Sequence, residues 1–389
     1  MAGLGAASRQ ILPHIARMPE MELAAGADIR PDALQAFEAR YRRKAFPGVE
    51  AMCASGEVDA VWVATPNPRH ADHTAVAAEH GLHIIVEKPM AVTLDEADRM
   101  IDAARRNGVK LVQGHSKIYG PAIRKIREIV RSGRLGPVIQ ISTWNFNDWL
   151  QRPRLASVVD TDIGGGVCFR QGPHQVDIVR YLGGGLVKSV RAATGRADGN
   201  FATEGDYTAF LEFEDGGRAT LVFNGYGFFD IAELTWGIGE GGKRIREAGR
   251  SGRKNRLAGP VDQLTKYDNP RTTEEDAVRE RADQSFFGLT VVACQRGVIR
   301  QSPGGLYVYA EGGREEIPCT PEEGRSAELR ELQQAIAQDR PAFPDGRWGK
   351  ATLEVCIAML QSSNQHREIA LMHQLPCADV QNLQEACHG

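Results

Sequence analysis

Short apolar segments alternate with amphipathic helical segments over the first 115 residues of the chain. The apolar segments, which we predict to be strands, lie at residues 23–27, 61–64, 84–86 and 110–113. The predicted helices lie at residues 31–40, 49–53, 70–80 and 94–107. Strands that alternate with helices are typical of a parallel sheet with crossover helices. The pattern therefore predicts an α/β Rossmann domain, with a doubly wound parallel sheet, over residues 1–118.

The pattern changes after about residue 118. A helix at residues 122–132 and a strand at residues 138–144 lead into alternating strands joined by glycine turns. Two hairpins are predicted across Asp-Gly-Gly and Glu-Gly-Gly turns, one joining 207–213 to 218–223 and the other joining 306–310 to 314–317. Further helices are predicted at residues 326–338 and 350–366. Residues 119–389 therefore predict an α+β domain with a large, mostly antiparallel sheet.

Residues 239–285 interrupt this second pattern, because they are rich in glycine at first and then rich in charge. Their basic residues are Lys243, Arg244, Arg246, Arg250, Arg253, Lys254 and Arg256. We interpret this basic cluster as a solvated loop. The glycine content would allow the segment to act as a lid but does not require it.

Composition and charge narrow the class of protein. Hydrophobic residues make up 42% and charged residues 25% of the 389 residues, as in ordinary globular proteins. The formal net charge of −3 argues against nucleic acid or an anionic membrane as the main partner. Seven scattered cysteines without a CxxC pair indicate reduced thiols, not a disulfide framework or a metal site. With no apolar run of 18 residues and no leader pattern, we expect a cytoplasmic protein without a membrane span.

A glycine turn stands close to the start of the sequence, at residues 3–8. Its two glycines allow the backbone to approach a pyrophosphate, which then lies at the N-terminus of the following helix. Small residues also stand near the third position that such turns usually keep small. The residues predicted to bind a dinucleotide cofactor here are Gly3, Gly5, Ala6, Ala7 and Ser8.

Asp28 follows the next predicted strand, about 20 residues after the turn. A carboxylate at this place binds the hydroxyls of the adenosine ribose and repels a 2′-phosphate. NAD is therefore the predicted cofactor. Arg30 is close enough to hold a 2′-phosphate, so NADP remains possible.

The glycine turn of such a domain normally follows the central strand of the sheet, yet only Met1 and Ala2 precede it here. A central strand pairs with both neighbours and buries a near-continuous apolar run. We therefore expect an apolar strand to be encoded upstream of Met1. The alternative is a sheet that is one strand short, with a weak hold on the cofactor.

The most informative segment is the strand at residues 84–86, which runs into Glu87-Lys88-Pro89. Thr93 and Glu96 then predict a capping box at the start of a helix. A strand that ends in a lysine places a cation where open α/β sheets bind ligands. If burial lowers its pKa, the Lys88 amine can hold a substrate hydroxyl or share in its proton transfer.

Taken together, the motifs resemble those of the glucose–fructose oxidoreductase / inositol dehydrogenase (Gfo/Idh/MocA) family over essentially the whole chain. The segments that carry this resemblance are the turn at 3–8, Asp28, Thr65-Pro66-Asn67 with His70, Glu87-Lys88-Pro89, Gly164-Gly165-Gly166, Gly172-Pro173-His174 with Asp177, and Leu353-Glu354-Val355. The resemblance implies a Rossmann domain followed by a domain for substrate binding and oligomerisation. It also implies oxidation of a secondary alcohol by hydride transfer to a nicotinamide, and a homodimer or homotetramer formed through the open face of the sheet.

The resemblance assigns roles to individual residues. The residues that it places on the cofactor side are Thr65, Pro66, Asn67, His70 and Glu87. Lys88 would lie beside the reacting hydroxyl and stabilise the developing alkoxide. His174 would be the general base or its partner, because imidazole titrates near neutral pH. No metal site is implied.

Arg170 departs from the family pattern, since the sugar and inositol dehydrogenases usually carry an aspartate four residues before the histidine. A guanidinium reverses the charge at this position and suits a carboxylate. Because it offers only donors, it argues against a plain sugar and for an anionic substrate. The alternative is a structural ion pair with Asp160 or Asp162.

The segment at residues 145–162 adds two arginines and an aromatic side chain to this predicted substrate wall, which also includes Trp144 and Phe146. The added residues are Arg152, Arg154 and Trp149. This segment and residues 168–174 are similar to a subgroup described as phthalate dihydrodiol dehydrogenases. That similarity implies oxidation of phthalate 4,5-cis-dihydrodiol to 4,5-dihydroxyphthalate. The alternatives are a sugar, uronate or inositol dehydrogenase of the same family and a non-catalytic, cofactor-sensing regulator.

Overall fold

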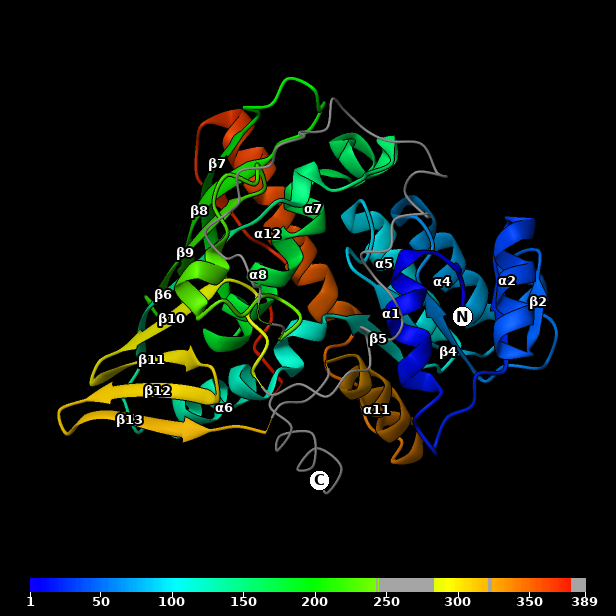
Figure 1. Cartoon of the computed structure of the whole chain (residues 1–389), viewed down its shortest axis with the longest axis horizontal. Coiled ribbons are helices and arrows are strands. Elements are labelled where there is room, and N and C mark those ends of the chain that lie inside the picture. The colour runs from blue at the N-terminus through cyan, green and yellow to red at the C-terminus, as the bar shows by residue number, and fades with distance from the viewer. Residues whose placement is uncertain (243, 245–282, 321–323, 379–389) are drawn as a thin grey trace.

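Two sheets with helices between them organise the structure (Figure 1). The computed structural model describes residues 1–242, 244, 283–320 and 324–378. A parallel sheet lies in the N-terminal part, and a large, mostly antiparallel sheet lies in the C-terminal part. The predicted combination of an α/β and an α+β unit is therefore confirmed. Most of the predicted excursion at 239–285, with all of its basic cluster except Arg244, lies outside the described residues.

The N-terminal sheet is parallel throughout. β1 (Ala25–Ala27) pairs with β2 (Lys44–Phe46), and β3 (Ala60–Val63), β4 (His83–Glu87) and β5 (Leu111–Gly114) pair in that order. The crossover helices are α2 (Pro31–Tyr41), α3 (Val49–Cys53), α4 (His70–Glu79) and α5 (Leu94–Arg106). Because helices cover the sheet, residues 84–86 are almost completely buried. The carboxyl ends of these parallel strands lie together at one edge of the sheet, and open α/β sheets bind their ligands at that edge.

The backbone of residues 1–3 lies between β1 and β3. Ala2 forms parallel bridges to both Ala27 and Val63. The Gly3 N–H also donates to the Ala27 carbonyl at 2.8 Å. Burial lowers the pKa of the Met1 α-amino group to about 5. These residues connect the two groups of parallel strands and lead directly into α1 (Ala6–Ile15).

The N-terminus of α5 shows how local sequence sets an element boundary. The Thr93 hydroxyl accepts from the Glu96 N–H, and the Glu96 carboxylate accepts from the Thr93 N–H, both at 3.2 Å. This arrangement confirms the predicted capping box, which satisfies two N–H groups that the helix leaves free. The helix buries Ala97, Met100 and Ala103 against the sheet domain.

The C-terminal sheet has the strand order β13-β12-β11-β10-β6-β9-β8-β7-β14. Its strands are β6 (Val138–Phe146), β7 (Val187–Gly195), β8 (Asp206–Phe213), β9 (Arg218–Asn224), β10 (Leu289–Cys294), β11 (Gly297–Ser302), β12 (Gly305–Ala310), β13 (Gly313–Pro318) and β14 (Ile369–Ala370). Among the described strands of this sheet, only β6 and β9 pair in parallel. Both predicted hairpins are confirmed, as β8–β9 and β12–β13.

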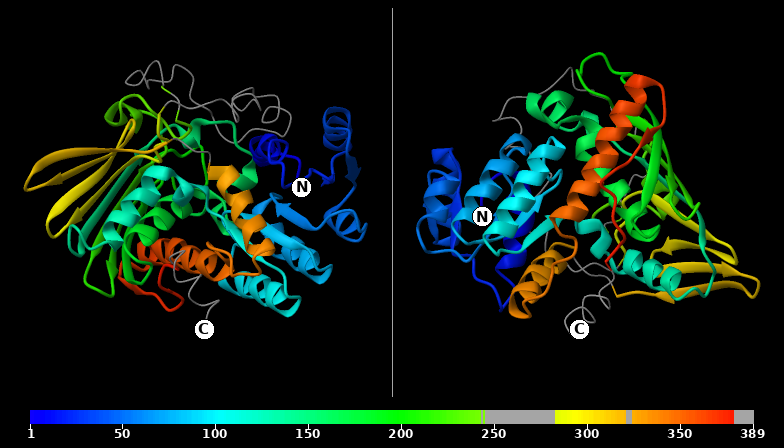
Figure 2. Two further views of the ribbon diagram at one scale, coloured as in Figure 1. Left: turned by 90° about the horizontal axis from the view of Figure 1, so that it is seen from below. Right: turned by 180° about the vertical axis from the view of Figure 1, so that it is seen from behind.

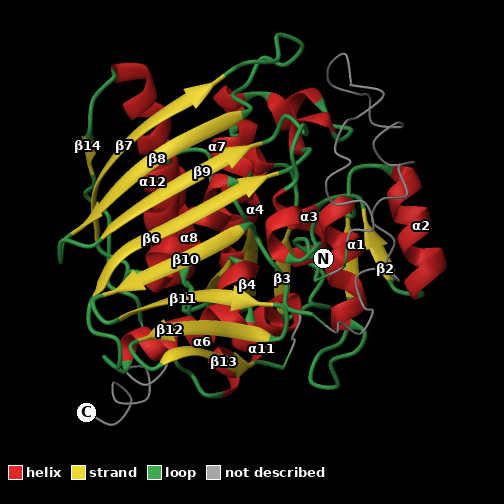
Figure 3. Ribbon diagram, turned by 60° about the vertical axis from the view of Figure 1, so that its left-hand side comes forward, coloured by secondary structure: helices red, strands yellow, loops and turns green. Residues whose placement is uncertain are grey.

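Helices cover one face of this sheet and leave the other open (Figure 3). The covering helices are α6 (Pro121–Arg131), α8 (Gly172–Leu182) and α12 (Gly346–Gln365). Along β8, Tyr207, Ala209 and Leu211 are buried under the helices, whereas Thr208 and Phe210 alternate with them on the open face. This period of two is expected for a sheet with one covered face.

The helices near the C-terminus pack against the N-terminal domain (Figure 2). α11 (Gly324–Ala337) packs against α1 and β4, and α12 packs against both α5 and α8. The Gln113 N–H at the end of β5 donates to the Pro344 carbonyl at 2.9 Å, just before α12 begins. In the part of the chain that the structure describes, no helix is long and apolar enough to cross a membrane.

Candidate active site

Lys88 lies where the two parts of the protein meet. It follows the last residue of β4, and its Nζ donates to the Arg170 carbonyl oxygen at 2.8 Å across the interface. Burial, and next the positive charge of Arg170, lower the pKa of Lys88 to about 7. The amine therefore exchanges a proton near neutral pH, as the sequence argument required.

His174 lies in the first turn of α8 and is buried. Its ring centroid is 4.7 Å from that of Phe287. Burial and the nearby charge of Lys88 hold the pKa of His174 well below its usual value, so the ring is neutral at neutral pH. Among the described residues, its Nδ1 has no hydrogen-bond partner. A buried polar atom without a partner is available to a ligand.

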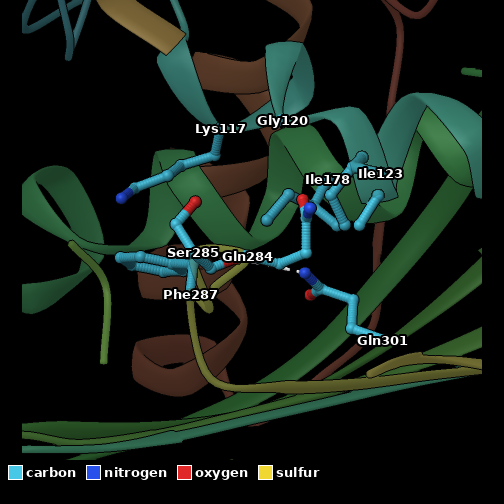
Figure 4. Close-up of a pocket in the computed structure, with 9 residues that line it drawn as sticks. Lys117, Gly120, Ile123, Ile178, Gln284, Ser285, Phe287 and Gln301 are labelled. Atoms are coloured by element: carbon cyan, nitrogen blue, oxygen red, sulfur yellow. Dashed lines mark hydrogen bonds between the residues drawn. The ribbon is translucent and has the colours of Figure 1, made fainter. Parts of the chain in front are cut away.

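Phe287 also lines a small hollow beside α6 and α8 (Figure 4). The Lys117 ammonium lies 5.4 Å from the centre of the Phe287 ring and extends along the same hollow. Its charge is one of those that lower the pKa of His174. Lys117 therefore adds a cation near His174, and no sequence motif marks it.

Arg170 lies at the end of the short helix α7 (Gly166–Arg170). Its guanidinium donates to Asn67 Oδ1, and Asn67 Nδ2 donates to the Gly164 carbonyl at 2.6 Å. Within the described residues, Arg170 forms no ion pair with Asp160 or Asp162, so that alternative is wrong. Its positive charge has an amide as its partner instead of a carboxylate.

His70 joins the turn after β3 to the turn after β4. Its Nε2 lies 2.8 Å from the Thr65 carbonyl oxygen, and its Nδ1 lies 2.9 Å from the Pro89 carbonyl oxygen. The side chain is 1% exposed. His70 therefore contacts the backbone of both turns and holds the residues that flank Lys88.

The predicted arginine-rich wall is assembled only in part. Arg154 lies over the Trp149 ring, 4.5 Å from its centre, so it covers this buried side chain. Burial and the charges of Arg152 and Arg170 hold the pKa of Arg154 well below its usual value. Arg152 Nε lies 2.7 Å from Asp148 Oδ1, so its charge already has a carboxylate partner.

Trp144 does not belong to this wall, which corrects the prediction. Its neighbours Thr143 and Asn145 are buried, whereas Trp144 is 46% exposed. Successive side chains of a strand point to opposite faces, so Trp144 lies on the open face of the large sheet.

The glycine turn fits a dinucleotide. Gly3 has a φ of +88°, and a Cβ there would lie 2.7 Å from the Ala64 carbonyl oxygen, so only glycine fits. Gly5 is the N-cap of α1 and supplies no side-chain cap, which leaves first-turn N–H groups for an anion. The other predicted residues of this turn, Ala6, Ala7 and Ser8, form the first turn of α1.

Asp28 and Arg30 form an ion pair beside this turn, with Arg30 Nε 3.2 Å from Asp28 Oδ1. Asp28 Oδ2 also accepts from the Leu4 N–H at 2.8 Å. Burial opposes ionisation of Asp28, but these hydrogen bonds outweigh it and lower its pKa. The carboxylate is therefore ionised next to the glycine turn, where a ribose would lie.

Comparison with known families decides the class of protein. The family described as "Oxidoreductase family, NAD-binding Rossmann fold" matches residues 1–115, and the "GFO/IDH/MocA C-terminal domain" matches residues 123–227. The chain belongs to the Gfo/Idh/MocA family. It is therefore an NAD(P)-dependent oxidoreductase with an NAD-binding Rossmann domain.

Several relatives of the Gfo/Idh/MocA family are similar over almost the whole chain. A 1-carboxy-3-chloro-3,4-dihydroxycyclohexa-1,5-diene dehydrogenase of Comamonas testosteroni is 33% identical over 93% of each chain. A solved protein of Bordetella bronchiseptica RB50, described as a dehydrogenase, is 35% identical, with a TM-score of 0.84 over 95% of this chain and 98% of that one. An Agrobacterium radiobacter oxidoreductase, solved with NAD+, L-tartaric acid and magnesium, shares the fold at 16% identity, with a TM-score of 0.71 over 95% and 96%.

The Gfo/Idh/MocA motifs do not reveal two buried groups beside the site. Arg325 Nη1 lies 2.6 Å from Glu87 Oε1. His115 Nδ1 lies 3.9 Å from Asp177 Oδ2, and burial lowers the pKa of His115 to about 3. Arg325 lies on a helix far along the chain, so no local spacing in the sequence could connect it with Glu87.

Proposed function

We propose that this dehydrogenase oxidises a carboxylated cis-dihydrodiol, with phthalate 4,5-cis-dihydrodiol as substrate and 4,5-dihydroxyphthalate as product. The observation that carries the proposal is the position of Arg170. In the described residues its guanidinium forms no ion pair with a carboxylate, and its positive charge is close enough to lower the pKa of Lys88. A substrate carboxylate bound by this guanidinium would therefore lie near the Lys88 amine.

A second arginine supports a substrate with two carboxylates. Arg154 contacts a ring and a backbone carbonyl, and its ionisation is opposed by the charge of Arg170. Two neighbouring guanidiniums without carboxylate partners in the described residues would be stabilised by a dianion. The Comamonas testosteroni relative is named for a carboxylated ring diol, which is the same substrate class with one carboxylate.

The proposed chemistry needs one proton acceptor and one hydride acceptor. A bound nicotinamide would supply the hydride acceptor for the ring carbon that bears the hydroxyl. The neutral Lys88 amine accepts the hydroxyl proton, and the neutral His174 ring orients the hydroxyl. The resulting ketone loses a ring proton and gains one on oxygen, which gives the aromatic diol. Aromatisation makes the overall step effectively irreversible.

The first experiment is to follow NADH formation with phthalate 4,5-cis-dihydrodiol and with myo-inositol in parallel. Turnover of the dihydrodiol alone supports the proposal. Turnover of inositol alone keeps the family activity but replaces this substrate with a polyol, which is the alternative of a sugar, uronate or inositol dehydrogenase. Absence of NADH with every candidate alcohol would favour a cofactor-sensing regulator.

Arg170→Ala tests the anchoring of the substrate. We expect KM for the dihydrodiol to rise by about 10- to 100-fold, because a charged hydrogen-bond donor to the substrate is lost. Arg152→Ala is the matched control, because Arg152 is already paired with Asp148 and should change KM less. An unchanged KM in Arg170→Ala would remove the argument for a carboxylated substrate.

We also propose that two or more copies assemble through the open face of the large sheet, as a homodimer or homotetramer. Trp144 and Phe210 are 46% and 42% exposed on this face. Large apolar side chains gathered on one sheet face are typical of an interaction surface. The family resemblance favours this assembly.

A further inference from the structure

Arg325 lies within a buried cluster of charges behind Lys88. It stands in the first turn of α11, with Nη1 2.6 Å from Glu87 Oε1 and 3.0 Å from Glu328 Oε2. Its guanidinium carbon lies 5.5 Å from the centre of the Trp62 ring. The exposed fraction of the Arg325 side chain is 15%, and that of Glu87 is 8%. Charges with this little water around them interact strongly.

The pairing is mainly between Arg325 and Glu87. Burial raises the pKa of Glu328, whose side chain is completely buried, although Arg325 opposes this effect. Of the two carboxylates, Glu87 lies nearer to the guanidinium, at 2.6 Å against 3.0 Å for Glu328. Removing one partner from such a buried pair leaves the other charge uncompensated.

Glu87 is the residue directly before Lys88, so its charge bears on the catalytic amine. An unpaired carboxylate next to an ammonium favours the protonated form. The charged and titratable groups whose electrostatic effect reaches Lys88 are Glu87, Arg170, Arg325, Glu240, His115 and His174. Of these, only Arg325 forms an ion pair with Glu87 in the described residues.

We propose that Arg325 is a positioning residue of the dehydrogenase, which pairs with the Glu87 carboxylate, cancels its charge beside Lys88 and so keeps the Lys88 amine ready to accept a proton. This inference rests on the proposed role of Lys88 but not on the identity of the substrate. A purely structural ion pair would connect α11 to β4 without influencing the protonation of Lys88.

Variants of the pair separate these two roles because their effects on Lys88 have opposite signs. Arg325→Gln leaves Glu87 unpaired, so the pKa of Lys88 should rise by about 1 to 3 pH units. Glu87→Gln removes the negative charge beside Lys88 and leaves Arg325 paired with Glu328, so the pKa of Lys88 should fall. Arg325→Lys keeps the charge, and the double variant Arg325→Gln/Glu87→Gln restores neutrality, so both should stay close to the wild type.

The measurement is an NMR titration of the protein labelled with [ε-13C, ζ-15N]lysine, with the Lys88 signal assigned by its loss in Lys88→Arg. It needs no substrate, so a failure of the dihydrodiol proposal leaves the test intact. The exposed Lys44, which pairs with Glu57, is an internal control whose titration should not change.

Opposite shifts in the two single variants, with recovery in the double variant, support the proposal. An unchanged Lys88 titration in Glu87→Gln or in Arg325→Gln overturns it, whatever happens to the stability of the protein. If Arg325→Gln does not fold, Glu87→Gln and the double variant still give the sign of the effect. With an active substrate, the pH profile of kcat/KM should move to higher pH in Arg325→Gln and remain in place in Arg325→Lys.

Discussion

Burial and the positive charge of Arg170 disfavour the protonated form of Lys88. The lowered pKa of this amine predicts how the rate of the reaction depends on pH. Because its pKa is about 7, the amine is mainly protonated below pH 7 and mainly neutral above it. In the proposed mechanism only the neutral form accepts the hydroxyl proton, so kcat/KM for oxidation should rise with pH through a midpoint near 7. A kcat/KM profile that is flat between pH 6 and 9 would contradict this role.

Lys88→Arg checks the same argument by substitution. Arginine keeps the positive charge but does not lose its proton in this pH range, so kcat should fall by about 100- to 10,000-fold while cofactor affinity is largely kept. Cofactor binding is measured by quenching of protein fluorescence on titration with NADH. Lys44→Arg, at an exposed position, should leave both quantities unchanged.

We expect Asp28 and Arg30 to decide between NAD and NADP at the level of single side chains. The Asp28 carboxylate is ionised and lies against the glycine turn, so it repels a 2′-phosphate. In Asp28→Ala, Arg30 loses its nearest carboxylate partner, although Asp32 Oδ2 stays 3.9 Å from its guanidinium, and it becomes more available to a phosphate. We expect kcat/KM with NADP, relative to NAD, to rise by at least about 10-fold. In Asp28→Ala/Arg30→Ala the gain for NADP should disappear, and a persistent gain would show that Arg30 does not hold the phosphate.

At the scale of elements, the sequence predicted the helices whose ends are marked by capping or turn residues. The predicted and observed ends of α2, α4 and α5 agree within one or two residues, because proline, glycine and a capping box mark them. α8 was not predicted as a helix. It is buried on almost all sides and begins with Gly172-Pro173, so it lacks the apolar stripe that reveals an amphipathic helix. The three-residue β2 is too short to give a periodic signal.

The capping box of α5 supports a prediction about element stability. Thr93→Ala removes the side chain that accepts from the Glu96 N–H, so the free energy of unfolding should fall by about 1 kcal/mol. Thr93→Ser keeps the hydroxyl and should recover most of this loss. Chemical denaturation of the three proteins measures the difference. Equal stability of Thr93→Ala and wild type would mean that the cap does not contribute.

At the scale of the whole molecule, the site forms where segments distant in sequence meet. Lys88 and the Gly3 turn could be predicted because motif and strand order place them at one edge of the parallel sheet. The contacts of Arg170 with Lys88 and Asn67, and of Arg325 with Glu87, depend on how the two parts of the chain pack together. The hydrophobic periodicity and the motif spacing of the sequence do not indicate how these distant segments pack. The partners of the predicted site residues could therefore be identified only in the structure.

The open sheet face predicts assembly at the same scale. The pairing of β6 with β9 and β10 places Val222 and Leu289 beside Trp144. A charge in the centre of such an apolar face would remain buried without a partner in an oligomer, so Trp144→Asp/Phe210→Asp should dissociate it into monomers. Light scattering coupled to size-exclusion chromatography gives the mass. Ile336→Asp, at a position that is 37% exposed on α11, is the matched control and should retain the mass of the wild type. A wild-type mass equal to one chain, or an unchanged mass in the double variant, would exclude this face as the interface.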